Sequence, residues 1–376
     1  MTNLPRRSLV AFPVALLAGC LFHGGSVPVA EPTPIDPPIE PPPTIPPRIT
    51  AYLTGVSTKL TAFDVDPDTG VFTQNGAAAE IGAQPDHFVV DPTGKFAYVI
   101  SNSGGQSDIV SFRFDETGLP IATGETYPAG SGVRMAMHPS GRSLYVIDVA
   151  NDLIQVFTVD DSKRLSPNGS VQTGPVPVHM SIHPSGNFAY VSHNNNGLGS
   201  IHVYSIDAAG VLTEIDENLV DLPGDPPGKI VIDRSGKFAY LAVFSFGEIW
   251  AYEIDALTGA LRLTGKHHVG TIPLGFAVDP SGSFVYAAAD QADSITALRS
   301  ANGAFSFIDA YATGARPSDL AVDASGRFVY VVNNNSESIS VYAIDRLTGA
   351  LTQKGQPFAA PSGLGPRGIV VVERPR

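Results

Sequence analysis

Seven recurring positions in the chain carry side chains that could hold an anion or polarise a carbonyl group. Each lies within an apolar segment that follows a loop, and each belongs to a different copy of a sequence repeat. The positions are His87, Arg134, His179, Lys229, Gly275, Asp319 and Gly368. Two imidazoles, two cations and one carboxylate in one ring could bind an anionic ligand or stabilise a developing oxyanion. We therefore predict a site wherever the fold brings these positions together.

Further polar residues adjoin the seven positions and extend the predicted site. Asp86, Arg316 and Arg367 are close in sequence to ring positions, and Asn194 lies in a polar loop. Loops carried by a rigid scaffold are common places for binding residues. The predicted ligand-binding residues are His87, Asp86, Asp319, Arg316, Arg367 and Asn194. If the protein is an enzyme, the predicted catalytic residues are His179, Arg134 and Lys229.

Several classes of site are missing from the sequence. It contains no Gly-x-Ser-x-Gly nucleophile motif, no His-Glu-x-x-His zinc motif and no phosphate-binding loop. The asparagine runs at 194–196 and 333–335 are typical of turns and have few carboxylates nearby for a cation. A formal charge of −13 leaves no basic stripe to neutralise phosphates. We therefore predict no cofactor, no metal site and no nucleic-acid partner.

A repeat of 44 to 50 residues positions the seven residues. Its clearest segment is a turn of the type Asp-Pro-Ser-Gly followed by a strand with Phe-x-Tyr-Val, and the turn glycine stands at 94, 141, 186, 236, 282 and 326. Proline presets one turn dihedral and glycine supplies the positive φ. A second turn with Thr-Gly, as at 254–261 and 344–351, joins two further strands. Repeats of this length with several short strands are typical of propeller blades.

The two ends of the sequence supply a seventh repeat. Residues 365–373 match the innermost strand of the unit, and residues 49–73 match its other three strands. The predicted fold is an all-β, seven-bladed β-propeller with four-stranded antiparallel blades, closed by N- and C-terminal strands in one blade. If the four strands of a blade are named A to D from the centre outward, the loops before strand A and between B and C share one face. The seven recurring positions should therefore surround one mouth of the central channel.

The first residues of the chain predict export. Arg6 and Arg7 precede an apolar run that is too short to span a bilayer, and the run ends in Leu-Ala-Gly-Cys, which resembles a bacterial lipobox. We predict a lipoprotein signal peptide over 1–19 and lipidation of Cys20, the single cysteine of the chain. An ordinary cleaved signal followed by a chance cysteine is the alternative.

The predicted cleavage before Cys20 also sets the bounds of the linker and of the propeller. Residues 20–48 form the lipidated cysteine and a proline-rich linker, because proline-rich sequence cannot form helix or sheet. Residues 49–376 form the propeller. Leu21 after the cysteine favours the outer membrane, so the domain would face the periplasm or the cell surface while the membrane holds its lipid. A propeller buries its own core, and we expect a monomer.

The repeat resembles that of the lactonase family of seven-bladed β-propellers, which includes bacterial 6-phosphogluconolactonases and fungal carboxymuconate cyclases. The resemblance covers residues 49–373 and rests on Pro-x-Gly-x-Φ-x-Tyr-Val, Val-Tyr-x-Ile-Asp and Thr-Gly-x-Leu, where Φ is apolar. The family's enzymes carry Gly-Pro-Arg-His before a loop with a glutamate, and these residues are thought to hold and polarise the lactone. Residues 177–194 retain His179 but have Val178 for the arginine and Asn194 for the glutamate. Residues 84–92 retain His87.

Two functional hypotheses follow, and whether the protein is an enzyme stays open. The preferred one is an exported propeller that holds a small anionic or sugar ligand at the channel mouth, or a protein partner at its blade edges. The alternative is a lactone hydrolase acting on an extracellular lactone, with His179 as general base and with Arg134 and Lys229 stabilising the oxyanion. Binding is preferred for two reasons. No glutamate adjoins His179 to orient it, and phosphorylated sugar lactones are cytosolic intermediates whereas this protein is predicted to be exported.

Overall fold

The computed structural model describes residues 48–195, 197–215, 219–222 and 226–374. Within these ranges all regular elements are β-strands, and no helix is long and apolar enough to cross a membrane. The predicted signal peptide, Cys20 and all but the last residue of the predicted linker lie outside the described residues.

Seven antiparallel sheets, here called blades 1 to 7, make up the described part of the chain. Blade 1 contains β31 (Pro366–Arg374), β1 (Arg48–Gly55), β2 (Lys59–Val65), β3 (Phe72–Gln74) and β4 (Ala79–Glu80). Blade 2 contains β5 (Gln84–Val90), β6 (Phe96–Ser103), β7 (Gln106–Phe114) and β8 (Pro120–Pro128). Blade 3 contains β9 (Gly132–Met137), β10 (Ser143–Asp148), β11 (Leu153–Val159) and β12 (Leu165–Gln172).

The remaining four blades follow in chain order. Blade 4 contains β13 (Pro177–Ile182), β14 (Phe188–Asn195), β15 (Leu198–Ile206), β16 (Leu212–Glu214) and β17 (Val220–Leu222). Blade 5 contains β18 (Pro227–Ile232), β19 (Phe238–Val243), β20 (Glu248–Ile254) and β21 (Leu261–His268). Blade 6 contains β22 (Pro273–Val278), β23 (Phe284–Ala289), β24 (Ser294–Ala301) and β25 (Ala304–Ala312). Blade 7 contains β26 (Pro317–Val322), β27 (Phe328–Asn333), β28 (Ser338–Ile344), β29 (Leu351–Gln353) and β30 (Phe358–Ala359).

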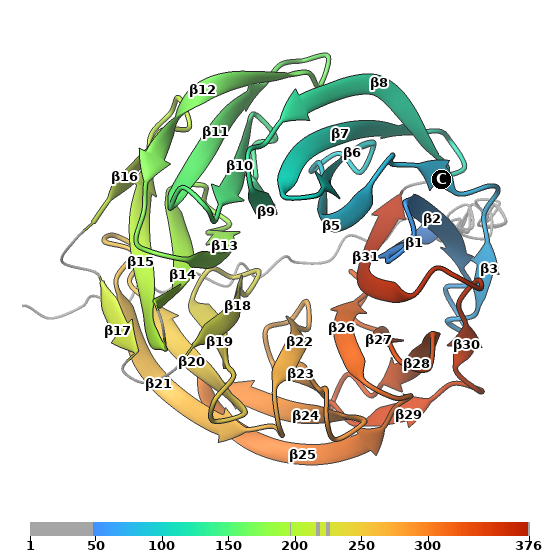
Figure 1. The fold of residues 1–376 in the computed structure, drawn as a ribbon. Helices are drawn as coiled ribbons and strands as arrows, with labels where there is room; N and C mark the ends of the chain where they lie inside the picture. The colour runs from blue at the N-terminus through green and yellow to red at the C-terminus, as the bar shows by residue number, and fades with distance from the viewer. Residues whose placement is uncertain (1–47, 196, 216–218, 223–225, 375–376) are drawn as a thin grey trace, which may run out of the picture. The chain divides into compact units, whose positions relative to one another are not determined.

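Blade 1 is built from both ends of the described chain, as predicted. β31 pairs with β1 along its whole length, from Arg48–Arg374 to Gly55–Pro366. Figure 1 shows red β31 beside blue β1 at the point where the ring closes. β1 therefore has a partner strand on each side, β2 and β31. The predicted all-β, seven-bladed propeller is confirmed.

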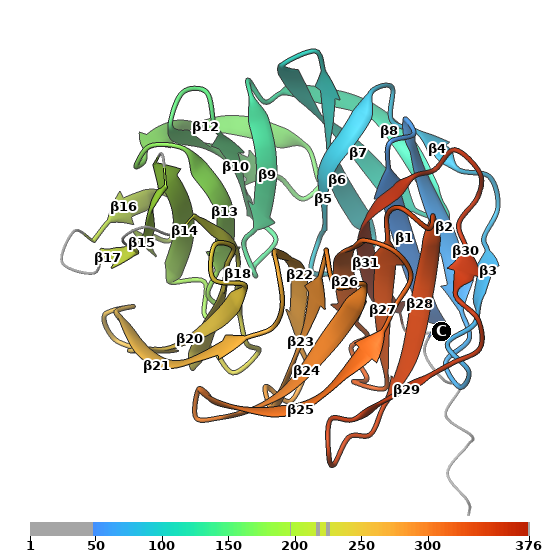
Figure 2. The same cartoon turned by 60° about the horizontal axis from the view of Figure 1, so that its bottom comes forward.

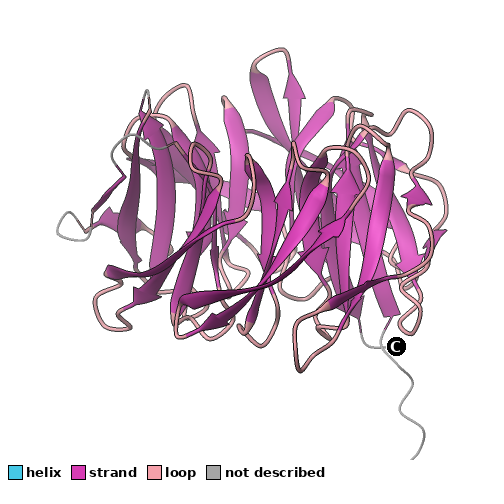
Figure 3. Ribbon diagram, turned by 90° about the horizontal axis from the view of Figure 1, so that it is seen from below, coloured by secondary structure: helices cyan, strands magenta, loops and turns pink. Residues whose placement is uncertain are grey.

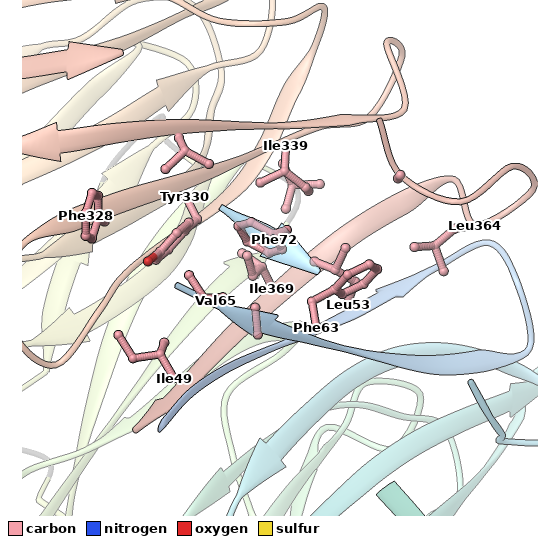
Figure 4. Close-up of a cluster of buried hydrophobic side chains, with 14 residues drawn as sticks. Ile49, Leu53, Phe63, Val65, Phe72, Phe328, Tyr330, Ile339, Leu364 and Ile369 are labelled. Atoms are coloured by element: carbon pink, nitrogen blue, oxygen red, sulfur yellow. The ribbon is translucent and has the colours of Figure 1, made fainter. Parts of the chain in front are cut away.

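Apolar side chains fill the space between neighbouring blades. Figure 4 shows this packing between blades 7 and 1, where Phe72, Tyr330 and Ile369 share one cluster. The rings of Phe72 and Tyr330 meet edge to face at 5.4 Å, a favoured aromatic geometry. Because each blade is covered on both faces, its second strand is apolar almost throughout, and β10 is buried at every position.

One tyrosine of the repeat ties each blade to the next along the chain. The tyrosines are Tyr52, Tyr98, Tyr145, Tyr190, Tyr240, Tyr286 and Tyr330, all fully buried. The hydroxyl of Tyr190 in blade 4 donates to the carbonyl of Gly259 in blade 5 at 3.0 Å. The hydroxyls of the other tyrosines make equivalent hydrogen bonds to the next blade. Tyr330 is the exception, because its hydroxyl has no hydrogen-bond partner among the described residues.

This difference predicts unequal effects for one substitution at two equivalent positions. Tyr190→Phe should lower the free energy of unfolding by about 1–3 kcal/mol, because it leaves the carbonyl of Gly259 without its donor. Tyr330→Phe should leave stability unchanged or raise it slightly, since its buried hydroxyl gains no bond. Urea denaturation of both variants checks this, and equal losses would contradict it.

The innermost strands stand around the centre of the ring, and their connections gather at two rims. Figure 2 shows β9, β13, β18, β22 and β26 around the centre with β12, β21 and β25 at the periphery. Figure 3 shows turns and loops along both rims, with strands running between them. Since strands alternate in direction, the loops before each innermost strand share a rim with the loops after each second strand. This arrangement determines which side chains meet at the channel.

Candidate functional site

A cavity of about 440 Å³ lies where the innermost strands of the seven blades converge. Its lining comes from β5, β9, β13, β18, β22, β26 and β31, which surround the centre in Figure 1, together with β1. The charged residues and histidines of the lining are Asp86, His87, Arg134, His179, Lys229, Asp319 and Arg367. These are seven of the nine predicted catalytic and ligand-binding residues, so the alignment of repeats did locate neighbours in space.

Two imidazoles lie next to each other in the lining of the cavity. The rings of His87 and His179 lie edge to face with centroids 6.4 Å apart. Burial, followed by the positive charges of Arg134 and Lys229, lowers the pKa of His87 to about 3. Burial and the imidazole of His87, with smaller effects of Lys229 and Arg134, hold the pKa of His179 well below 6.5. Both rings are therefore neutral at physiological pH.

The two imidazoles differ in the atoms they leave free. Nδ1 of His87 accepts the backbone N–H of Met135 at 3.3 Å, so its neutral ring carries the proton on Nε2. Nδ1 of His179 is buried and has no hydrogen-bond partner in the described part of the chain. His87 can thus donate a hydrogen bond from Nε2. Because the enclosed Nδ1 of His179 cannot contact a ligand, this ring must act through Nε2, which makes no hydrogen bond to the described residues. The arrangement provides one donor and one acceptor or base.

The guanidinium of Arg134 is the most deeply placed positive charge of the lining. Its Nη1 donates to the carbonyl of Val133 at 2.8 Å, and it forms no ion pair within the described ranges. Burial lowers the pKa of Arg134, while the carboxylates of Asp86 and Asp319 partly offset this effect. The pKa remains far above physiological pH for any arginine. A ligand oxygen can therefore meet a charged donor that no carboxylate neutralises by contact.

Lys229 and Asp319 form an ion pair that joins blades 5 and 7. Nζ of Lys229 lies 3.4 Å from Oδ1 of Asp319, whose Oδ2 accepts the backbone N–H of Ile369 at 3.3 Å. Gly275 of the intervening blade makes this approach possible, because a Cβ there would lie 2.6 Å from the Cα of Asp319. The absence of a side chain at this ring position is therefore a packing requirement. Because its carboxylate is already engaged, Asp319 serves mainly to orient Lys229 and not to bind a ligand.

Arg316 and Asn194 lie outside the cavity lining, in contrast to the prediction that they share the site. The guanidinium of Arg316 turns outward and makes a two-pronged ion pair with Asp290, at 3.0 and 3.1 Å. The side chain of Asn194 accepts the N–H of Gly197 within its own hairpin at 3.3 Å. Local partners therefore hold both side chains away from the channel. Asp86 is in the lining, where Asn102 donates to it at 3.2 Å.

Phe244 is a lining residue that the sequence argument did not identify. A Cβ at Gly228 would lie 2.3 Å from its ring, so the aromatic side chain packs directly against the backbone beside Lys229. A partial signal was present in the sequence. At this position after the second strand four of the other repeats have asparagine or aspartate, as at Asn102 and Asp290, while two have the smaller Val56 and Val149. Phe244 is the only aromatic residue among the seven.

A family model described as "Lactonase, 7-bladed beta-propeller" matches residues 48–131, 129–300 and 284–367. The chain belongs to this lactonase family. The resemblance stated from the repeat is thereby confirmed. A curated relative of this lactonase-family chain is a 6-phosphogluconolactonase of Enterobacter sp. (strain 638), which is 26% identical over 247 residues, covering 63% of this chain and 73% of the relative.

Solved structures share the fold of this lactonase-family propeller. A protein from Lactobacillus plantarum has a TM-score of 0.76 at 19% identity, covering 87% of this chain and all of that one. The periplasmic gluconolactonase of Pseudomonas aeruginosa has a TM-score of 0.71 at 19% identity, covering 88% of this chain and all of that one. At these identities the likeness shows the architecture, and the chemistry must be argued from the cavity.

Proposed function

We propose that this propeller hydrolyses a sugar lactone in the central cavity. The observation that carries the proposal is the juxtaposition of two neutral imidazoles, His87 and His179, with the charged donors Arg134 and Lys229. The volume of about 440 Å³ lies in the range of roughly 300–1,000 Å³ common for small-molecule sites. The named activities of relatives in Enterobacter and Pseudomonas agree with a lactone as substrate.

The chemistry divides between the base and the donors. Nε2 of His179, the ring nitrogen that is not enclosed, takes a proton from the attacking water as the new C–O bond forms. Arg134 and Lys229 stabilise the negative charge that develops on the carbonyl oxygen. Collapse of the tetrahedral intermediate breaks the bond to the ring oxygen, which recovers the proton from the imidazolium. The product is a single open-chain hydroxy acid.

His87 adds a donor rather than a second base. Because its Nδ1 accepts from the Met135 backbone, the proton on Nε2 is available to a ligand oxygen. Its low pKa prevents a further positive charge from forming beside Arg134. The pair therefore combines a neutral donor and a neutral base in a cavity that already holds cations.

Binding without turnover is the second candidate, and one observation favours it. No carboxylate of the described residues bonds to either imidazole, and Asn194 in place of the family's glutamate does not line the cavity. A base without an orienting partner is less effective. The same ring of donors would then hold a sugar acid or lactone at the channel mouth.

A pH-controlled lactone screen separates the two candidates. The purified protein is given glucono-, galactono-, phosphoglucono- and homoserine lactones in a pH-stat, with spontaneous hydrolysis subtracted. If it is an enzyme, kcat/KM for its substrate should stay level from pH 8 to well below pH 6.5. The reason is that the base must be neutral, and burial lowers the pKa of His179 below its ordinary value.

Two outcomes would contradict this proposal. A loss of activity centred near pH 6.5 would indicate an exposed histidine as the base, and ligand-dependent thermal shifts without turnover would indicate a binding protein. Acid also weakens the fold, since the unfolded chain binds protons on histidine at higher pH than the buried rings do. The rates are therefore measured only where the melting temperature is constant.

A further inference from the structure

A second cavity, of about 430 Å³, lies between blades 2 and 3, away from the channel. It is bounded by the end of β8 and by β11 and β12, and Figure 1 shows the end of β8 beside these two strands. None of its lining residues lines the central cavity. The lining residues are Tyr127, Pro128, Asp148, Leu153, Gln155, Val156, Phe157, Pro167, Gly169 and Ser170. This space is a site independent of the lactone cavity.

The only charged group of this second lining is a buried carboxylate. Asp148 is 2% exposed and ends β10. Its oxygens accept the backbone N–H of Asn151 at 3.3 Å, the side-chain amide of Asn151 at 3.1 and 3.0 Å and that of Gln155 at 3.2 Å. All these donors are neutral, and within the described ranges Asp148 forms no ion pair. The hydrogen bonds stabilise the carboxylate in place, but no positive charge pairs with it, whereas buried carboxylates are usually paired.

The other residues that line the second cavity are suited to contact the apolar part of a ligand. Pro128, Leu153, Phe157 and Pro167 line it, and Tyr127 places an aromatic ring beside them. The hydroxyl of Tyr127 is buried and has no hydrogen-bond partner among the residues described. An aromatic face attracts a cation, whereas the enclosed hydroxyl is not exposed to a ligand in the cavity. Charge and shape therefore favour one class of occupant.

A β-bulge in β12 contributes one wall of the cavity. The pairing of β11 with β12 shifts register between Gln155 and Phe157, so extra residues of β12 lie between Pro167 and Ser170. Gly169 within this bulge has a φ of 88°, a conformation that favours glycine. The outer strands of blades 2, 5 and 6 have register shifts at the corresponding place, so the bulge is a feature of the repeat, and the residues that line this cavity are what distinguish it.

We propose that this second cavity binds a small organic cation, an ammonium group carried on an apolar body. The ammonium group lies toward Asp148, and the body packs against the prolines and Phe157. The cation would neutralise the carboxylate that neutral amides leave charged. Binding at this site stands apart from the lactone chemistry and does not depend on it.

Titration calorimetry of the purified protein with n-hexylammonium at pH 7 tests the proposal. Saturable binding is expected, with 1-hexanol and hexanoate binding at least about tenfold more weakly, since a charged hydrogen bond adds roughly 1.5–3 kcal/mol. Asp148→Asn should weaken hexylammonium binding by about tenfold or more. Because that variant could fold poorly, Ser170→Trp provides a second measurement: Ser170 is exposed, and the large ring should fill the cavity without touching Asp148.

Asp86→Asn is the matched control, because it removes a carboxylate from the central cavity instead. It should leave hexylammonium binding unchanged. The proposal is overturned if hexanol binds as well as hexylammonium, if Asp148→Asn and Ser170→Trp bind normally, or if only Asp86→Asn abolishes binding. Absence of any saturable heat up to the solubility limit would also overturn it.

Discussion

Replacing His179 with alanine should reduce lactone hydrolysis by at least about 100-fold, the lower end of the range for removal of a general base. Nε2 of His179 makes no hydrogen bond to the described residues and is left for the water, while Nδ1 is enclosed and the low pKa keeps the ring neutral. In His87 the Nδ1 accepts the Met135 N–H, so Nε2 carries the proton and His87 cannot replace His179 as base. The measurement is kcat/KM in the pH-stat for whichever lactone the wild-type protein hydrolyses.

Two comparisons show whether the loss is chemical. His267→Ala, on the outer strand β21, removes an imidazole far from the cavity lining and should leave the rate unchanged. Free imidazole should restore part of the rate of His179→Ala, because the deleted ring leaves space of its own shape. An alanine variant with full activity would show that another group activates the water.

Removing the last strand should prevent the domain from folding stably. A chain that ends at Gly365 lacks β31, which pairs with β1 along its whole length and buries Ile369. At about 0.5–1.5 kcal/mol for each lost hydrogen bond, and roughly 2–5 kcal/mol for the large buried side chain, the loss approaches the roughly 5–15 kcal/mol that stabilises a typical domain. Circular dichroism during heating should show no cooperative transition.

A circular permutant is the matched control for this truncation. Arg48 and Arg374 are paired neighbours, so a four-residue Asp-Pro-Ser-Gly turn can join them as in other blades. New ends placed between the exposed residues Gly76 and Ala77 leave every sheet intact. The permutant should melt like the wild-type protein. If the truncated chain melts equally well, pairing of the two ends is not what holds the ring closed.

The lining of the central cavity shows how far a repeat can locate a site. Because His87, Arg134 and His179 occupy the same position in successive repeats, any closed ring must bring them to one mouth, and this could be predicted without coordinates. Arg316 is not one of the aligned positions but lies three residues before Asp319, and its side chain pairs outward with Asp290. A sequence position gives the strand of a residue, whereas the nearest opposite charge decides the direction of a long side chain.

The sequence by itself determined the number of blades, their four-stranded pattern and the closure by both termini, because turn chemistry and strand alternation act locally and recur with a fixed period. Only the tertiary structure decided which ring nitrogen of each histidine can act on a ligand, that Lys229 reaches Asp319 past Gly275, and that Asp148 is buried with no cationic side chain of the described residues paired to it. These properties depend on distances between residues of different strands and often different blades. Such distances arise from packing, which no single repeat contains.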